Sequence, residues 1–258
     1  MIELKLERGI YELELKAPPV NEIGLPMLDA LERVLDQIDP AQGRALLIYS
    51  SLPSGFCAGA DLRALYAGLL STPDPAERAQ RIGDFIDRIH VVMDRLDTLP
   101  ITTVGAIHGV CFGGGFELAL TCDVLVADKT ARFAFPELRL GIVPGFGGIP
   151  RLKRDVGNAI VRDLLQTGRS MNAKRAQNIG LVSQMVAQGK HVQAARATAQ
   201  QAARFDADAN ATCKTFIKPL PSAELALEKE HFKRLVQRPV VLAALKKFVE
   251  STDLRPYL

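Results

Sequence analysis

Three consecutive glycines at positions 113–115 constrain the fold of this chain more than any other feature of its sequence. They lie between a strand-like apolar segment, Ile101 to Ile107, and a helical stretch, Phe116 to Thr121. Because glycine has no Cβ, the backbone N–H groups of such a turn can approach a ligand closely. The N-terminus of the helix adds a partial positive charge. The turn therefore suits an anion, or a carbonyl oxygen becoming one, although a purely structural tight turn has the same pattern.

Strand-like and helix-like segments alternate along the rest of the sequence. Residues 2–7 and 10–16 alternate apolar with polar side chains, which predicts two strands joined at Gly9. The apolar positions from Leu25 to Ile38 fall on one helical face, and Ala45 to Tyr49 is typical of a buried strand. A strand–helix–strand order favours parallel pairing, so we expect an α/β fold.

The composition of the chain changes after about residue 190, where helical patterns rich in alanine and charge dominate and glycine is absent. We therefore expect a core over residues 1–195 and a helical region over residues 196–258. The second region is a candidate for assembly of the protein. Neither region contains a fixed-period repeat or a low-complexity tract.

Charge and hydropathy exclude several classes of protein. The 258 residues include 32 basic and 29 acidic side chains, a net charge of +3 that is too weak to indicate nucleic acid or an anionic membrane as partner. No apolar run reaches the ~18 residues of a membrane span. The first eight residues alternate apolar with charged side chains, unlike a signal peptide, so we expect a cytoplasmic protein. The four cysteines lack metal-site spacing, and we expect them to be small buried apolar groups.

Two glutamates are candidates for acid–base chemistry. Glu117 lies in the first turn of the helix after the glycines, and Glu137 follows Pro136 at another helix start. Acidic side chains complement the helix dipole there, so each has a purely structural alternative. Together, two carboxyl groups with separated pKa values can hold a water, one acting as base and the other as acid. A second small-residue turn, at residues 55–61, can supply another backbone donor.

Competing chemistries find no support in the sequence. The chain has no GxSxG nucleophile elbow and no GxxxxGK(S/T) phosphate-binding loop. A second glycine-rich turn, at residues 145–148, lacks the third glycine of a dinucleotide fingerprint. The four histidines show no metal-ligand spacing, and we expect no bound metal.

Several short motifs follow one another in a fixed order. They are Phe56 to Leu62, Ala106 to Val110 leading to Gly113 to Ala119, Cys122-Asp123, Phe135 to Glu137, Leu140 to Gly148, and Gly180 to Val182. This ordered set resembles the enoyl-CoA hydratase/isomerase (crotonase) family. The resemblance covers nearly the whole chain and is strongest from residue 45 to residue 185.

The resemblance implies a spiral of ββα units that forms two roughly perpendicular sheets, followed by a helical region used for trimerisation and for covering the active site. Family members usually form trimers or dimers of trimers. The implied substrate is an acyl-CoA thioester whose carbonyl is held by the N–H groups of Ala60 and Gly114. Glu117 would orient and activate a water, and Glu137 would deliver a proton to Cα. No metal or redox cofactor is implied. The other positions implied to contact the substrate are Ala58, Asp61, Leu62, Arg63, Phe112, Gly113, Pro136, Gly145 and Phe248.

The chain departs from the family pattern near its C-terminus. Family members often have Phe-x-Glu-Lys-Arg there, with a lysine that contacts a CoA phosphate, whereas this chain has Ser251 at the lysine position. Arg63 is retained as a cation, and Lys247 or Arg255 can compensate. Because both glutamates are kept, hydration is the favoured reaction. Double-bond isomerisation and other enolate chemistry, such as C–C cleavage, are alternatives, and a non-catalytic RNA-binding role is a remote one.

Overall fold

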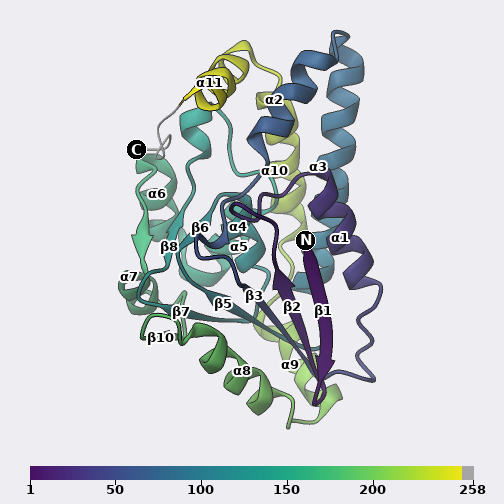
Figure 1. The fold of residues 1–258 in the computed structure, drawn as a ribbon, viewed down its shortest axis with the longest axis vertical. Helices are drawn as coiled ribbons and strands as arrows, with labels where there is room; N and C mark the ends of the chain where they lie inside the picture. Colours follow the sequence, from purple (N-terminus) through teal and green to yellow (C-terminus); the bar gives the residue numbers. More distant parts are fainter. Residues whose placement is uncertain (252–258) are drawn as a thin grey trace.

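Two β-sheets and the helices that cover them form the fold of the computed structural model, which describes residues 1–251 (Figure 1). The larger sheet has six strands in the order β1 (Ile2–Glu7), β2 (Ile10–Leu15), β3 (Ala45–Ser50), β5 (Thr102–Ile107), β7 (Val124–Asp128) and β10 (Gln184–Val186). The smaller sheet has four, in the order β4 (Gly55–Cys57), β6 (Val110–Phe112), β8 (Arg132–Ala134) and β9 (Met171–Asn172).

The chain visits the two sheets alternately. β3, β5 and β7 each add a parallel strand to the larger sheet, and β4, β6 and β8 follow them directly in the smaller one. Helical structure comes after each such pair, which gives the repeating ββα unit. The expected hairpin at Gly9 is confirmed by the antiparallel pairing of β1 with β2, and the expected parallel pairing by β2 with β3.

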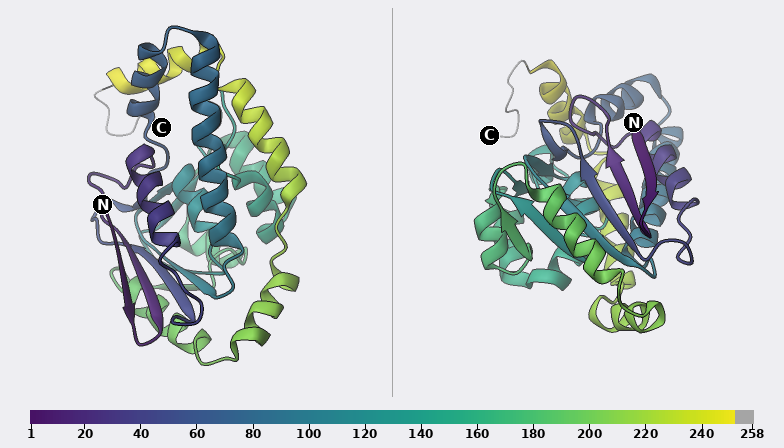
Figure 2. Two further views of the ribbon diagram at one scale, coloured as in Figure 1. Left: turned by 90° about the vertical axis from the view of Figure 1, so that its right-hand side faces the viewer. Right: turned by 60° about the horizontal axis from the view of Figure 1, so that its bottom comes forward.

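Helices cover both faces of the larger sheet. In chain order they are α1 (Leu25–Leu35), α2 (Leu62–Ser71), α3 (Pro75–Asp97), α4 (Gly114–Ala119), the 3₁₀ helix η1 (Glu137–Leu140), α5 (Gly148–Val156), α6 (Asn158–Thr167), α7 (Ala173–Asn178), α8 (His191–Ala202), α9 (Ala207–Ile217), α10 (Ser222–Leu235) and α11 (Pro239–Glu250). Figure 2 shows α10 beside the long helix α3, and α11 near α2 at the end of the molecule far from α8 and α9.

Helix α8 packs against the larger sheet through its small side chains. Ala195 and Ala199 are fully buried against Ala45, Val104 and Val126 of three neighbouring strands. Parallel strands are buried on both faces, which explains why these strands read as continuous apolar runs. The predicted division between residues 195 and 196 falls inside this helix, both halves of which lie on the sheet.

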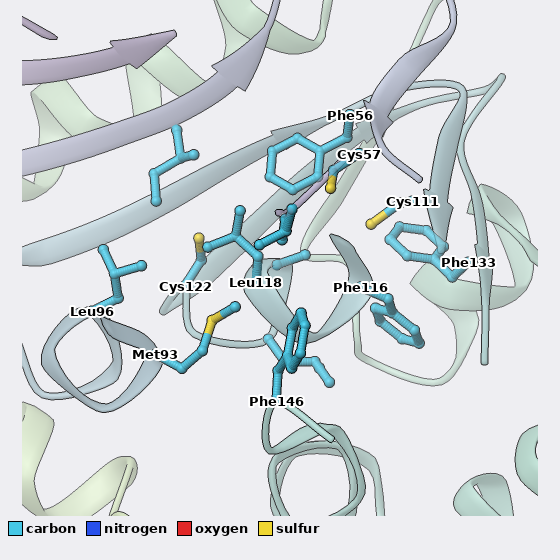
Figure 3. Close-up of a cluster of buried hydrophobic side chains, with 14 of the residues drawn as sticks. Phe56, Cys57, Met93, Leu96, Cys111, Phe116, Leu118, Cys122, Phe133 and Phe146 are labelled. Carbon is cyan, nitrogen blue, oxygen red and sulfur yellow. The ribbon is translucent and has the colours of Figure 1, made fainter. Parts of the chain in front are cut away.

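The main core lies between the two sheets and helices α3 and α4, and Figure 3 shows part of it. Phe116 stacks on Phe135 with ring centroids 4.7 Å apart and contacts Phe133 at 5.2 Å. The sulfur atoms of three buried cysteines, Cys57, Cys111 and Cys122, lie in this cluster. The prediction of buried cysteines is wrong for the fourth, Cys213, which is exposed on helix α9.

A buried arginine fastens helix α5 to helix α3. The Arg151 side chain is fully buried, and its guanidinium donates to carboxylates of Asp97 at 2.7 Å and Asp94 at 2.5 Å. It also donates to the carbonyl oxygens of Phe146 and Gly147, at 3.1 and 3.3 Å. A buried charge is tolerated when it is paired and hydrogen-bonded in this way. Arg151 therefore fixes the start of α5 both to α3 and to the two residues that precede the helix.

Candidate active site

Three turns meet at one edge of the smaller sheet. β4 is parallel to β6, and β6 is parallel to β8. Carboxyl ends of neighbouring parallel strands lie at the same edge, so the segments that leave them are brought together. These segments are residues 58–61 after β4, residues 113–115 after β6 and residues 135–137 after β8. Sequence motifs that lie almost 80 positions apart thus form one site.

The first two turns bring the backbone amides of Ala60 and Gly114 close together. A Cβ atom on Gly114 would lie 3.4 Å from the Ala60 nitrogen, and one on Gly59 would lie 3.1 Å from the Gly114 nitrogen. Gly59 has φ +105° and Gly113 has φ +49°, conformations that side chains other than glycine rarely adopt. Hydrogen bonds from Ile23 N–H to Gly59 O and from Gly113 N–H to Ala134 O fix the two turns.

Glu117 points from α4 toward the start of α5. Its Oε1 atom accepts hydrogen bonds from the N–H groups of Phe146, at 2.7 Å, and Gly148, at 2.8 Å. Burial in the apolar core raises the pKa of Glu117 to about 7, although these amide donors favour the charged form and lower it. A carboxyl group with this pKa can exchange a proton near neutral pH.

Glu137, at the start of η1, is the second buried carboxyl group. Burial, and then the charge of Glu117, raise the pKa of Glu137 well above its usual value. Its Oε2 atom is buried and has no hydrogen-bond partner among the described residues. Its Oε1 atom faces Gly113, where a Cβ atom would lie only 2.6 Å away. The glycine therefore leaves room for the Glu137 carboxylate beside the turn.

The converging turns line a small cavity of about 50 Å³, which adjoins an apolar cavity of about 240 Å³. The two share Ala60, Leu65, Phe146 and Phe232 as walls. The larger cavity lies between α2 and α3, and its walls include Leu69, Ile82, Phe85 and Ile86. Arg78 and Arg81 line it as well. A ligand at the Ala60–Gly114 turns can thus extend into an apolar space.

Most of the site residues predicted from the sequence lie together, and four lie apart. The small cavity is lined by Ala58, Ala60, Leu62, Gly113, Gly114, Glu117, Pro136, Glu137 and Gly145. Asp61 lines only the larger cavity, and its side chain caps α2 by accepting from Ala64 N–H at 2.8 Å. Phe112 lies in β6 and lines neither cavity.

The other two of these four residues, Arg63 and Phe248, contact each other. The Arg63 guanidinium lies 5.8 Å from the centre of the Phe248 ring and donates to Val249 O at 3.3 Å. These contacts join α2 to α11 beside the site. Arg255, considered above as a substitute for the missing lysine, lies outside the described residues.

Helix α10 brings two residues to the site that the sequence did not reveal. Phe232 lines both cavities, and a Cβ atom on Gly145 would lie 2.4 Å from its ring. Glu228, one helical turn earlier, is buried against the start of α5. Their spacing of four on a helical face was a detectable signal, but this charge-rich segment was expected only to be helical and to serve assembly and active-site cover. Glu228 thus adds a third buried carboxyl group to the site.

Within residues 1–251, no group of three or more His, Cys, Asp or Glu side chains is arranged so that it could hold a metal ion. Over the same range, no helix has the length and apolar character needed to cross a bilayer.

Comparison with known proteins agrees with the fold and the order of the motifs. The family model for enoyl-CoA hydratase/isomerase matches residues 5–255, and the chain belongs to this family. It is 34% identical over 203 residues to the mitochondrial methylglutaconyl-CoA hydratase of Rattus norvegicus, covering 76% of this chain and 60% of the relative. It is 35% identical over 194 residues to the mitochondrial enoyl-CoA hydratase domain-containing protein 2 of Mus musculus, covering 73% and 61%.

The crystal structure of an enoyl-CoA hydratase from Bacillus anthracis superposes with a TM-score of 0.76 at 27% identity, covering 96% of both chains. The crotonase fold expected from the motifs is therefore confirmed. The match to these two mammalian relatives spans only about three fifths of their length, 60% and 61%.

Proposed function

We propose that the protein adds water across the α,β double bond of an acyl-CoA thioester, as an enoyl-CoA hydratase. One observation carries the proposal: two buried carboxyl groups, Glu117 and Glu137, share a cavity with the converging backbone turns at Ala60 and Gly114. This combination provides a binding site for a thioester oxygen and two proton-transfer groups beside it. The family and the hydratase names of its relatives support the same chemistry.

The N–H groups of Ala60 and Gly114 would hold the thioester oxygen. Negative charge develops on this oxygen when water adds to the β-carbon and an enolate forms. Two preorganised donors stabilise that charge, and the loss of one such donor typically costs about 3–4 kcal/mol. Because the amides supply this stabilisation and no electron transfer is needed, the reaction requires neither a metal ion nor a redox cofactor.

The two glutamates would divide the proton transfers between them. Glu117 accepts two amide hydrogen bonds on Oε1, so Oε2 is the atom that would take a proton from water as its oxygen bonds to the β-carbon. Glu137, whose raised pKa favours the protonated form, would then give its proton to the α-carbon. The product gains one oxygen and two hydrogens, and the next cycle requires a proton to pass from Glu117 to Glu137.

The larger cavity would receive the acyl chain. Its side chains from α2 and α3 are mainly aliphatic or aromatic. An acyl chain long enough to contact them is therefore favoured over a short one. α2 extends along the cavity for ten residues, or about 15 Å at 1.5 Å per residue. We therefore expect medium-length enoyl-CoAs to be better substrates than crotonyl-CoA. Contacts of Arg63 and Phe248 with the CoA portion remain predictions.

The direct test is turnover of crotonyl-, octenoyl- and dodecenoyl-CoA, followed by loss of the conjugated-thioester absorbance and by mass spectrometry. Hydration adds the mass of one water, whereas an isomerase leaves the mass unchanged and C–C cleavage splits the acyl group. We expect Glu117→Gln and Glu137→Gln to lower kcat by at least about a hundredfold. Glu230→Gln, an exposed change on α10, is the control. Full activity of both site variants contradicts the assigned roles.

RNA binding without turnover would instead support the non-catalytic alternative. Such binding would weaken steeply as salt rises, because it depends on phosphate contacts.

We also propose that the chain assembles as a trimer or a dimer of trimers. Phe216 and Ile217, at the end of α9, are 81% and 72% exposed, an unusual state for neighbouring large apolar side chains. Light scattering after size-exclusion chromatography measures the assembly directly. A monomer at micromolar concentration contradicts this proposal, and Phe216→Asp should weaken a trimer. The cytoplasmic location stays a prediction.

A further inference from the structure

Residues 145–149, the segment that begins helix α5, lie between two buried carboxylates. On one side, the N–H groups of Phe146 and Gly148 donate to Oε1 of Glu117. On the other side, the intervening amides donate to Glu228 of α10, Gly147 N–H to Oε1 at 2.7 Å and Ile149 N–H to Oε2 at 2.8 Å. Alternate amides of one short segment thus bind two different glutamates.

We propose that Glu228 is a positioning residue for the reaction: by binding Gly147 and Ile149, it holds the 145–149 segment so that the alternate amides fix Glu117. This inference rests on the proposed hydratase function. The first amides of a helix have no partners within the helix, and a side chain that accepts from them sets where the helix begins. Glu228 accepts from two such amides with its two oxygens.

The packing of α10 shows that this contact is built for close approach. Leu225, Glu228 and Phe232 are the buried residues of α10, and all three face the 145–149 segment. A Cβ atom on Gly145 would lie 2.4 Å from the Phe232 ring, and one on Gly147 would lie 2.7 Å from Leu225. Gly147 has φ +99°, so the turn depends on glycine for its conformation as well as for space.

Three carbonyl oxygens of the segment are also engaged, so Glu228 adds to an existing restraint. His90 Nε2 bonds to Gly145 O at 2.9 Å, and Arg151 donates to the carbonyl oxygens of Phe146 and Gly147. Of these partners, only Glu228 accepts from the N–H groups of Gly147 and Ile149. Each amide that binds Glu228 is adjacent in sequence to one that binds Glu117. If Gly147 and Ile149 shift, the N–H groups that donate to Glu117 must therefore move as well.

The test substitutes Glu228→Gln, which keeps the shape of the side chain. Glutamine has one acceptor oxygen, so its amide group would face an N–H donor at Gly147 or Ile149. We expect kcat for enoyl-CoA hydration to fall by about ten- to a hundredfold with KM changed less than about twofold. Amide hydrogen exchange across residues 145–149 should accelerate by at least about tenfold.

Glu230→Gln, an exposed change on the same helix, is the matched control and should alter neither measurement. If Glu228→Gln does not yield folded protein, Glu228→Asp, which keeps a carboxyl group but reaches less far, is measured in the same way. The proposal is overturned if exchange of the segment matches the wild type, or if kcat stays within about twofold of it. A wild-type protein without any hydratase turnover refutes the proposed function instead, and the exchange measurement then decides alone whether Glu228 holds the segment.

Discussion

The N–H group of Gly148 donates to Oε1 of Glu117 at 2.8 Å, and the same glycine makes room for the glutamate side chain. A Cβ atom on Gly148 would lie 2.8 Å from Cγ of Glu117 and 2.8 Å from the Phe135 ring. Contacts this short between carbon atoms force one partner to move. Both the donor and the space at this position therefore serve the orientation of Glu117.

Gly148→Ala should accordingly impair catalysis more than folding. The added methyl group displaces Glu117 from its position over the cavity, and we expect kcat to fall by about ten- to a hundredfold. Steady-state kinetics with octenoyl-CoA measures the change. Gly83→Ala on α3 is the control, because the nearest atom to its Cβ would be the Lys233 ammonium at 3.7 Å. Equal kcat values for the two variants would contradict the role of this contact.

The pH dependence of the reaction should reflect the pKa of about 7 that burial gives Glu117. A general base works only when deprotonated, so kcat/KM should rise as pH increases through about 7. Glu137 acts as an acid and has a pKa raised well above its usual value, so activity should decline again once it ionises at higher pH. Initial rates with crotonyl-CoA between about pH 5 and pH 10 give this profile. A rate that stays constant from pH 5 to pH 7 would remove Glu117 as the base.

The same raised pKa predicts how stability changes with pH. Between about 4.5 and 7 the folded protein binds a proton at Glu117 that the unfolded chain has lost. Folding is therefore favoured below this window, and the contribution disappears as pH rises through about 7. Glu117→Gln removes this titration. The free energy of unfolding of the variant, relative to that of the wild type, should therefore increase by about 3 kcal/mol from about pH 4.5 to about pH 8.

Urea denaturation of both proteins at several pH values checks this prediction. Glu230→Gln, with its exposed side chain, should follow the wild type throughout. Parallel curves for Glu117→Gln and wild type would show that Glu117 titrates as in the unfolded chain.

Gly68 offers a test of the acyl cavity. It lies on α2, lines the larger cavity, and has no atom within 4 Å of the position that a Cβ would occupy. Gly68→Phe should fill the cavity, so kcat/KM for dodecenoyl-CoA should fall by at least about tenfold while that for crotonyl-CoA changes little. Gly68→Ala, which adds one methyl group to a helix, is the control. Equal losses for both substrates would mean that the acyl chain lies elsewhere.

Much of the fold and the centre of the site could be predicted from local patterns. The hairpin at Gly9, the buried strand at residues 45–49 and the turns at residues 55–61 and 113–115 have clear signals in glycine content and apolar periodicity, although residues 55–57 of the first turn form strand β4. Helix α1 was predicted to extend to Ile38 but ends at Leu35, since the next residues turn although their apolar spacing continues.

Other features depend on contacts that local patterns do not contain. The strands β4 and β6 are each only three residues long, too short for a periodic signal, and they are defined by pairing with each other and with β8. The burial of Glu228 could not be predicted, because a charged residue in a charge-rich helix is expected to be exposed. Only the packing of α10 on the turn at residues 145–149 reveals that this side chain is buried.

The attachment of α10 to the start of α5 has a consequence for biosynthesis. A ribosome makes Ala60, Gly114, Glu117 and Glu137 long before it reaches Glu228. If that late glutamate sets the geometry of Glu117, the nascent polypeptide acquires its backbone donors and carboxyl groups first and its full reactivity only after helices α10 and α11 emerge. Swapping those helices for ones from a distant homologue would then alter turnover even though no reacting group had been exchanged.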